Sequence, residues 1–130
     1  KLYDLIEAWR KKRGANDCAW FQEYYNVAES GFADIEDRRA LIVDGRVAGL
    51  NAGWKIPNSD MFYGAIGLHD YSVRDLGAML YLEDLVWMKE QGYKEIDMGG
   101  SDKALLRFKL QFGDPVSQYK THIFSVTKRN

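Results

Sequence analysis

The sequence predicts an α/β (α+β) fold with one mixed sheet, in which an antiparallel meander is followed by a β-α-β crossover. Two β-type runs, 39–43 and 47–54, flank the dipeptide Asp44-Gly45, which favours a tight hairpin. A third β-type run at 61–68 precedes a helical pattern at 73–91 and another short β run at 95–98. A helix between two strands predicts a crossover connection, so the later strand should lie parallel to the third.

Two helices are predicted before the first strand. Residues 3–13 carry apolar side chains at helical spacing and end in four cations, which suit the negative end of the helix dipole; Gly14 ends the pattern. Asn16 or Asp17 is a suitable N-cap for a second helix that runs to about Ser30, before Gly31. Its apolar face is formed by Trp20, Phe21, Tyr24 and Val27.

Three more elements are expected after the third strand. The helix at 73–91 begins at a candidate capping box, Ser72 with Asp75, and stops at Gly92. After the strand at 95–98, Ser101 or Asp102 caps a short helix that ends at Gly113. A last strand is predicted at 117–126, because Pro115 excludes a continued helix.

Composition sets the class of protein. The 130 residues and 15.0 kDa fit a single domain, 1–130. A net charge of −1 gives no support for binding DNA, and no apolar run approaches the ~18 residues that span a bilayer. Cys18 is the only cysteine, and no signal peptide is recognisable, so we expect a reducing, cytoplasmic location. Because the chain starts without Met, we also expect it to be part of a longer protein.

A carboxylate in the long helix is a candidate catalytic group. Glu83 falls on the predicted apolar stripe, which contains Leu76, Met79, Leu80, Val86 and Trp87. A buried Glu has a raised pKa and is suited to act as a general base or to orient one. The alternative, favoured about two to one, is a structural Glu that reaches solvent or pairs with a lysine.

The start of the same helix is a candidate anion site. Arg74, Asp75, Leu76, Gly77 and Ala78 would offer a cation and unpaired N–H groups to a phosphate. The alternative is an ordinary capped helix. Just before this segment lie His69, a candidate base near neutral pH, and the candidate substrate contacts Asp70 and Tyr71.

A second cluster of candidates follows the strand at 95–98. Substrate contacts are expected from Asp97, Gly99, Gly100, Ser101 and Phe108. Lys109 is a candidate partner for a developing negative charge, and Tyr119 in the last strand is a candidate proton donor. Their alternatives are a solvated helix lysine and a packing tyrosine. His122 is taken as structural, and no metal site is expected from two histidines without paired spacing.

The order of elements over residues 17–126 resembles the GNAT acyltransferase superfamily. Within it, DMGGSDKALLRFKLQFG resembles the Fem-like branch and the C-terminal domain of phosphatidylglycerol lysyltransferases. The matching positions are Asp97, Gly99, Gly100, Ser101, Phe108, Lys109, Phe112 and Gly113. The resemblance implies an acyl or aminoacyl transferase whose co-substrate is acyl-CoA or aminoacyl-tRNA, with a small-molecule, peptide or lipid-headgroup acceptor. It also implies a preceding domain or a homodimer.

The resemblance assigns roles to the candidate residues. Lys109 would stabilise the oxyanion or bind the donor, Arg74 and the nearby amides would hold phosphate, and His69 or a carboxylate would take the proton. One departure is that the superfamily's Gln/Arg-x-x-Gly-x-Gly/Ala signature appears as Arg74, Gly77 and then Met79, which is not small. Two alternatives therefore stay open: an acetyl-CoA-dependent small-molecule N-acetyltransferase and a non-catalytic GNAT-like binding module.

Overall fold

A computed structural model describes residues 1–14, 18–100 and 103–115. The chain divides into two compact units, Lys1–Gly100 and Ser101–Asn130. The first unit contains α1 (Leu2–Arg13), α2 (Cys18–Glu29), β1 (Asp37–Val43), β2 (Arg46–Lys55), β3 (Met61–His69), α3 (Leu76–Glu90) and β4 (Glu95–Asp97), and the second contains α4 (Lys103–Lys109). Within these ranges no helix is long and apolar enough to cross a membrane.

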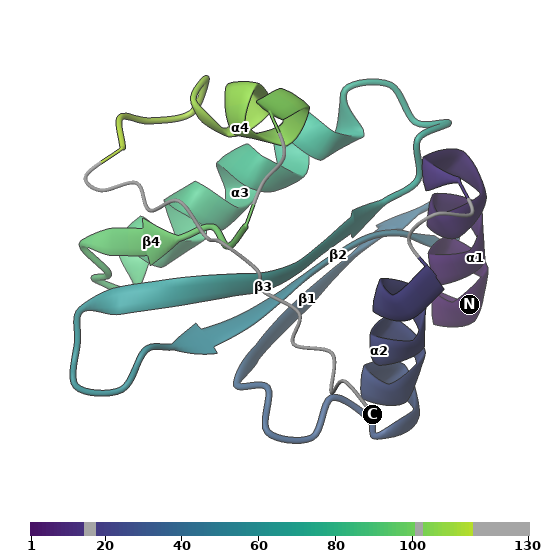
Figure 1. The fold of residues 1–130 in the computed structure, drawn as a ribbon, viewed down its shortest axis with the longest axis horizontal. Coiled ribbons are helices and arrows are strands. Elements are labelled where there is room, and N and C mark those ends of the chain that lie inside the picture. Colours follow the sequence, from purple (N-terminus) through teal and green to yellow (C-terminus); the bar gives the residue numbers. More distant parts are fainter. Residues whose placement is uncertain (15–17, 101–102, 116–130) are drawn as a thin grey trace, which may run out of the picture. The chain divides into compact units, whose positions relative to one another are not determined.

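Four strands form one mixed sheet in the order β1-β2-β3-β4 (Figure 1). β1 and β2 pair antiparallel through the turn at Asp44 and Gly45, both of which have positive φ, as this tight turn requires. β2 and β3 are also antiparallel, and α3 carries the chain across to β4, which lies parallel to β3. The predicted meander and crossover are therefore confirmed. The strand predicted at 117–126 lies outside the described residues.

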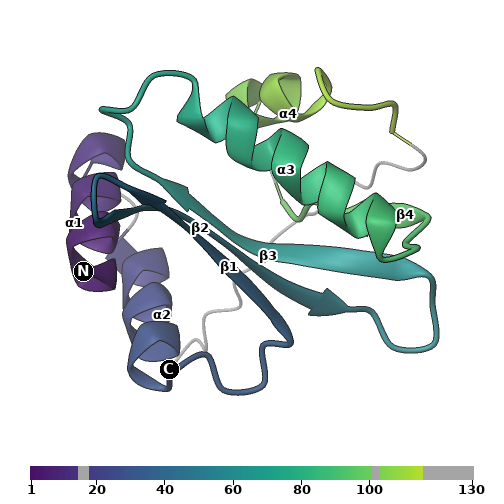
Figure 2. The same cartoon turned by 180° about the vertical axis from the view of Figure 1, so that it is seen from behind.

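Helices cover both faces of the sheet in the first unit (Figure 2). On one face, α1 and α2 pack on β2 and β3, and the shared core contains Leu5, Ile6, Trp9, Phe21, Leu50, Ala52, Ile66 and Leu68. On the other face, α3 places Leu76 and Leu80 against Ala48. A Cβ built at Gly49 would lie 2.5 Å from Leu80 Cδ1, so this glycine lets the helix approach the sheet closely.

An extra residue in β3 shapes the edge of the sheet next to β4. Ile66 pairs with Ala52, whereas Gly64 pairs with Gly53, which leaves Ala65 without an opposite residue. Such a bulge bends its strand and increases the local twist. The pairing of β3 with β4 covers only Met61–Tyr63 and ends just before the bulge. The two parallel strands therefore diverge from this point.

The start of α3 differs from its prediction. The helix begins at Leu76 instead of residue 73, and its N-cap, Asp75, has a left-handed backbone and makes no side-chain capping bond. The capping box was predicted wrongly because Ser72 has a nearer partner. Its hydroxyl and its N–H both donate to Asp70 Oδ1, at 2.6 and 2.9 Å. This local turn competes with helix formation and holds the segment open for about one more turn.

A substitution at Gly53 tests whether the backbone at the bulge leaves room for a side chain. A Cβ at this position would lie 2.1 Å from the main-chain oxygen of Tyr63, and backbone cannot move aside as a flexible side chain does. We expect Gly53→Ala to lower the free energy of unfolding by about 1–3 kcal/mol or more. Urea unfolding followed by circular dichroism measures this change.

Gly67→Ala is the matched control in the same sheet. A Cβ there meets only Asn51 Oδ1, at an ordinary contact distance of 3.8 Å, so its effect should be much smaller. Equal losses of stability in the two variants would contradict the argument, because a general cost of replacing strand glycines would then explain both.

Candidate functional site

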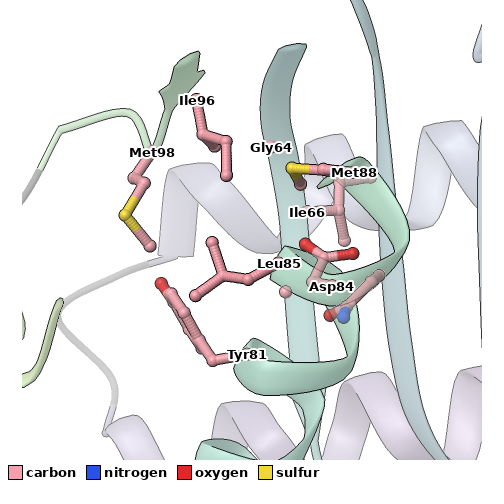
Figure 3. A pocket seen from close by; sticks show the side chains of 10 residues that line it. Gly64, Ile66, Tyr81, Asp84, Leu85, Met88, Ile96 and Met98 are labelled. Atoms are coloured by element: carbon pink, nitrogen blue, oxygen red, sulfur yellow. The ribbon is translucent and has the colours of Figure 1, made fainter. Parts of the chain in front are cut away.

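A cavity of about 50 Å³ lies where β3 and β4 diverge, under α3. We call it the β3–β4 cavity. Figure 3 shows Ile96 and Met98 on one side of it, and Tyr81, Leu85 and Met88 reaching in from the helix. Its full lining is Asn51, Gly64, Ile66, Gly67, Tyr81, Asp84, Leu85, Met88, Ile96 and Met98. The walls are thus mostly apolar, with a few polar groups from β2 and α3.

The edge of β3 beside this cavity offers main-chain hydrogen bonds to a ligand. From Gly64 to His69, the strand pairs with β2 on one side and has no strand on the other side within the described residues. An unpaired strand edge is a template for any extended chain that carries amide groups. Gly64 and Gly67 also line the cavity, and they leave this backbone accessible because they have no side chains.

A half-buried ionic cluster lies beside the cavity. The guanidinium of Arg39 in β1 donates to Asp84 of α3 and, at 2.9 Å, to Asp37 Oδ2. Its Cζ lies 4.0 Å from the ring centroid of Trp87, so the cation also rests on an aromatic face. From β2, Asn51 Nδ2 donates to the main-chain oxygen of Leu80 at 3.1 Å. The cluster therefore attaches α3 to β1 and β2 by polar contacts.

Burial governs the protonation of this cluster. Removal from water raises the pKa of Asp84, and the positive charge of Arg39 opposes the shift without cancelling it. Burial also raises the pKa of the Tyr81 hydroxyl, to which the charge of Asp84 adds. Both groups line the β3–β4 cavity. A ligand in the cavity would thus meet a neutral phenol and a carboxylate that protonates more readily than an exposed one.

The sequence predicts Glu83 as the candidate carboxylate of α3, whereas the structure places its neighbour Asp84 beside the cavity. Glu83 is exposed, as its alternative interpretation held, and the half-buried acid is Asp84. The predicted stripe included Met79 and Val86, which the structure leaves 41% and 53% exposed. The buried residues of α3 are Leu76, Leu80 and Met88 instead, and Asp84 lies on the same i, i+4 row. The spacing of residues 76, 80, 84 and 88 was visible in the sequence. The prediction, however, gave more weight to the apolar residues Met79, Val86 and Trp87, and these placed Glu83 on the stripe instead of Asp84.

The β3–α3 loop brings several predicted residues together. His69, the last residue of β3, packs over the first turn of α3, where a Cβ at Gly77 would lie 2.8 Å from His69 Cε1. The His69 ring also contacts Tyr71, with 4.3 Å between ring centroids. Burial lowers the pKa of His69; the negative charge of Asp70 opposes this shift, and the positive charge of Arg13 adds to it. The imidazole is therefore neutral near pH 7 and able to accept a proton.

The first turn of α3 keeps unpaired N–H groups. Within the described residues, the amides of Asp75, Gly77 and Ala78 make no backbone hydrogen bond, whereas the Leu76 amide donates weakly to Val73 at 3.4 Å. Leu76 is buried in the core, so its side chain is not available to a ligand. Arg74 has a side chain that is 94% exposed, and its Nε lies 3.3 Å from Asp75 Oδ2. The segment thus presents an exposed cation and amides without a backbone partner, and anion binding there stays a prediction.

The other predicted residues fall into three groups. Asp97 ends β4 and accepts a hydrogen bond from the Gly99 amide at 2.8 Å, which fixes the turn before Gly100. Phe108 and Lys109 belong to α4; Phe108 contacts Phe112, and Lys109 is only 8% exposed instead of solvated as its alternative assumed.

Ser101, Tyr119 and His122 lie outside the described residues. In the part of the chain that is described, no group of three or more potential ligands is arranged to hold a metal ion.

Comparisons with known proteins identify the fold. No family model and no curated protein matches the sequence. Solved structures do: PaiA N-acetyltransferase from Thermoplasma acidophilum in complex with coenzyme A is 18% identical, with a TM-score of 0.61 over 92% of this chain and 86% of that chain. A GNAT-family acetyltransferase from Streptococcus pneumoniae is 15% identical, with a TM-score of 0.55 over 100% and 92%.

This chain has the GNAT acetyltransferase fold. A further match is a transcriptional regulator from Bacillus halodurans C-125, which is 15% identical, with a TM-score of 0.60 over 94% of this chain and 91% of that chain. The predicted GNAT-like architecture is confirmed by these matches, whereas nothing among them distinguishes a Fem-like branch. At such low identity the likeness concerns the fold alone.

Asp84 gives the ionic cluster a testable pH dependence. Because folding raises the pKa of Asp84 above its ordinary value of 3.8, the folded protein holds this proton more tightly than the unfolded chain. Ionisation of Asp84 therefore costs stability as the pH rises through its folded-state pKa. Asp84→Asn cannot ionise. We expect the stability of wild type relative to Asp84→Asn to be greater at pH 4 than at pH 7 in urea unfolding.

The exposed neighbour provides the control for this experiment. Glu83→Gln removes a carboxylate from the same helix without touching Arg39, so it reports the effect of the overall charge change. If the difference between wild type and Asp84→Asn is the same at both pH values, burial does not control this carboxylate.

Proposed function

We propose that this protein is an acyltransferase that moves an acyl group from acyl-CoA to an amine. The observation that carries the proposal is the edge of β3 at Gly64–His69, which has no partner strand within the described residues, runs beside the β3–β4 cavity and ends next to the first turn of α3. A long donor with amide groups at one end and phosphates at the other suits this arrangement. The similar structure from Thermoplasma acidophilum, in complex with coenzyme A, supports this class of donor.

The phosphate end of the donor would lie at the start of α3. The amides of Asp75, Gly77 and Ala78 have no backbone partner in the described residues, and the helix dipole adds partial positive charge at this end. Arg74 would supply a full charge, exchanging its exposed contact with Asp75 for a phosphate. Exposed ion pairs contribute little, so this exchange costs little.

The amide-bearing arm of the donor would follow the edge of β3. Its amide groups would hydrogen-bond to the strand as an added strand does, and the glycines at 64 and 67 would let it approach. The apolar walls of the β3–β4 cavity, such as Leu85 and Ile96, would exclude water from the thioester. Met79, which replaces a small residue of the family signature, is exposed on α3 and does not line this cavity.

In the proposed reaction, the amine nitrogen attacks the thioester carbon, a C–N bond forms, and the C–S bond breaks to release a thiolate. The amine loses one proton, for which ionised Asp84, a residue that lines the cavity, is the proposed acceptor, because His69 packs on the first turn of α3, at the phosphate end of the donor. The thiolate takes up a proton from solvent as it leaves, which balances the proton that the amine has lost. The resemblance of the sequence assigns Lys109 to the negative oxygen of the tetrahedral intermediate, because a nearby cation stabilises such charge.

An aminoacyl donor is kept as a second proposal. It is supported by the resemblance of the segment from Asp97 to Gly113 to the Fem-like branch, including Phe108 and Lys109. Both donors present an activated carbonyl, so the chemistry at the amine would be the same. They differ in what binds at the start of α3, and a direct binding experiment separates them.

Coenzyme A binding is the first test. We expect calorimetric titration to show binding to wild type and about tenfold weaker binding to Arg74→Ala, the equivalent of ~1.4 kcal/mol for one charge-assisted contact. Arg38→Ala, which removes an exposed guanidinium from β1, is the matched control and should bind normally.

Three outcomes would count against the acyl-CoA proposal. Absence of binding would exclude it, and thermal stabilisation by charged tRNA under the same conditions would then favour the aminoacyl donor. Tight binding that is unchanged in Arg74→Ala would place the donor on another element. Binding of coenzyme A, combined with no release of thiol from acetyl-CoA in the presence of primary amines, would favour the non-catalytic alternative.

Lys109 is the second test. We expect Lys109→Met, which keeps the side-chain length and removes the charge, to lower the turnover of acetyl-CoA with a panel of primary amines by about a hundredfold or more. Lys103→Met changes an exposed lysine of the same helix and should be near wild type. Unchanged turnover in Lys109→Met, or loss of the folded state in a thermal melt, would assign Lys109 to structure alone.

A further inference from the structure

A second cavity, of about 140 Å³, lies between α1 and the beginning of β2. We call it the α1 cavity. It shares no lining residue with the β3–β4 cavity. Its lining is Lys1, Asp4, Leu5, Ala8, Gly45, Arg46, Val47 and Asp70. Charges of both signs therefore lie around a space that also has an apolar wall.

Arg46 is the cation of this cavity that can accept a ligand. Its side chain is 65% exposed, and its Nη1 lies 3.7 Å from Asp70 Oδ2, which is long for an ion pair. The structure gives this guanidinium no hydrogen bond among the described residues. A guanidinium has five N–H groups in a planar fork, which matches the two oxygens of a carboxylate.

Asp70 and Asp4 provide the negative side of the cavity. Asp70 Oδ1 already accepts both bonds from Ser72, so Oδ2 is the oxygen that remains toward Arg46. The hydrogen bonds from Ser72 lower the pKa of Asp70, which keeps it ionised. Asp4 lies in the first turn of α1, and its side chain is 88% exposed. Both carboxylates are thus available to an ammonium group.

Electrostatics select against ligands with a single charge. The lining has two cationic residues, Lys1 and Arg46, and two anionic ones, Asp4 and Asp70. A simple anion at Arg46 would therefore also face carboxylates, and a simple cation at Asp70 would also face cations. Like-charge contacts of this kind are a common means of rejecting the wrong ligand. A molecule that carries both charges a few bonds apart meets each group with its complement.

We propose that the α1 cavity binds a small zwitterion of the α-amino-acid type, with its carboxylate on Arg46 and its ammonium on Asp70 and Asp4. The side chain of the ligand would rest on Leu5, Ala8 and Val47. The volume of about 140 Å³ is several times what a single water needs, so the cavity has room for a small ligand. This site is independent of the proposed donor site and needs no donor to be occupied.

Three probes of similar size test the charge requirement. L-alanine carries both charges, propionate only the negative one, and L-alaninamide only the positive one. Each is titrated into the whole ¹⁵N-labelled chain without coenzyme A, and backbone amide shifts are followed. L-alanine should shift the resonances of residues 45–47 and 70 in a saturable manner, and the other two should bind at least about tenfold more weakly, as expected for one lost charged contact.

Two variants test the location. Arg46→Gln removes the carboxylate partner, and Ala8→Phe fills the cavity from an exposed position of α1 without changing the core. Both should weaken L-alanine binding by about tenfold or more. Lys55→Gln, an exposed cation at the opposite end of β2, is the control and should bind as wild type does.

Any of three results would overturn the proposal: no saturable shift with L-alanine, equal binding of propionate, or binding that neither variant at the cavity weakens. None of these results affects the coenzyme A titration, so a failure here and a failure of the proposed acyl transfer are separate findings.

Discussion

The short pairing between β3 and β4 is the constraint on which the candidate site depends. Three residue pairs hold the strands together, and the bulge at Ala65 then turns β3 away from its neighbour. Continued pairing would close the β3–β4 cavity and cover the edge of β3 with hydrogen bonds. Gly53, opposite the bulge, has no room for a side chain because the Tyr63 carbonyl occupies that space. A local packing requirement in the centre of the sheet thereby produces an opening at its edge.

Two kinds of contact position α3 above this opening: apolar contacts, which have no preferred direction, and polar contacts, which do. Leu80 rests on Gly49, and hydrophobic contact of this kind tolerates some sliding. The contacts of Arg39 with Asp84 and of Asn51 with the Leu80 carbonyl are directional and fix the rotation of α3 about its axis. The orientation of the helix start, where a phosphate would bind, is thus determined two turns away.

Local sequence signals were sufficient for the fold and insufficient for the site. Asp44-Gly45, Gly92 and the strand–helix–strand order each act over a few residues, so the meander and the crossover could be predicted. Asp84 could not be separated from Glu83, because adjacent helix positions differ by 100° and the apolar residues surround the helix almost evenly. The burial of Arg39 depends on pairing between distant strands, which no local pattern encodes. Ser72 was assigned the wrong partner for a related reason. Its side chain could bond either to Asp70, two residues before it, or at the start of the helix, three residues after it, and the sequence does not distinguish the two.

Trp87 gives the molecule an internal optical reporter. Its indole lies against the Arg39 guanidinium on one side and forms an edge contact with Phe62, at 5.5 Å between ring centroids. Both neighbours belong to the sheet, whereas Trp87 belongs to α3. The emission of this indole therefore depends on how closely the helix lies on the strands. With the other three tryptophans replaced by phenylalanine, small movements of α3 over the sheet become visible as changes in intensity and wavelength, without any label attached to the chain.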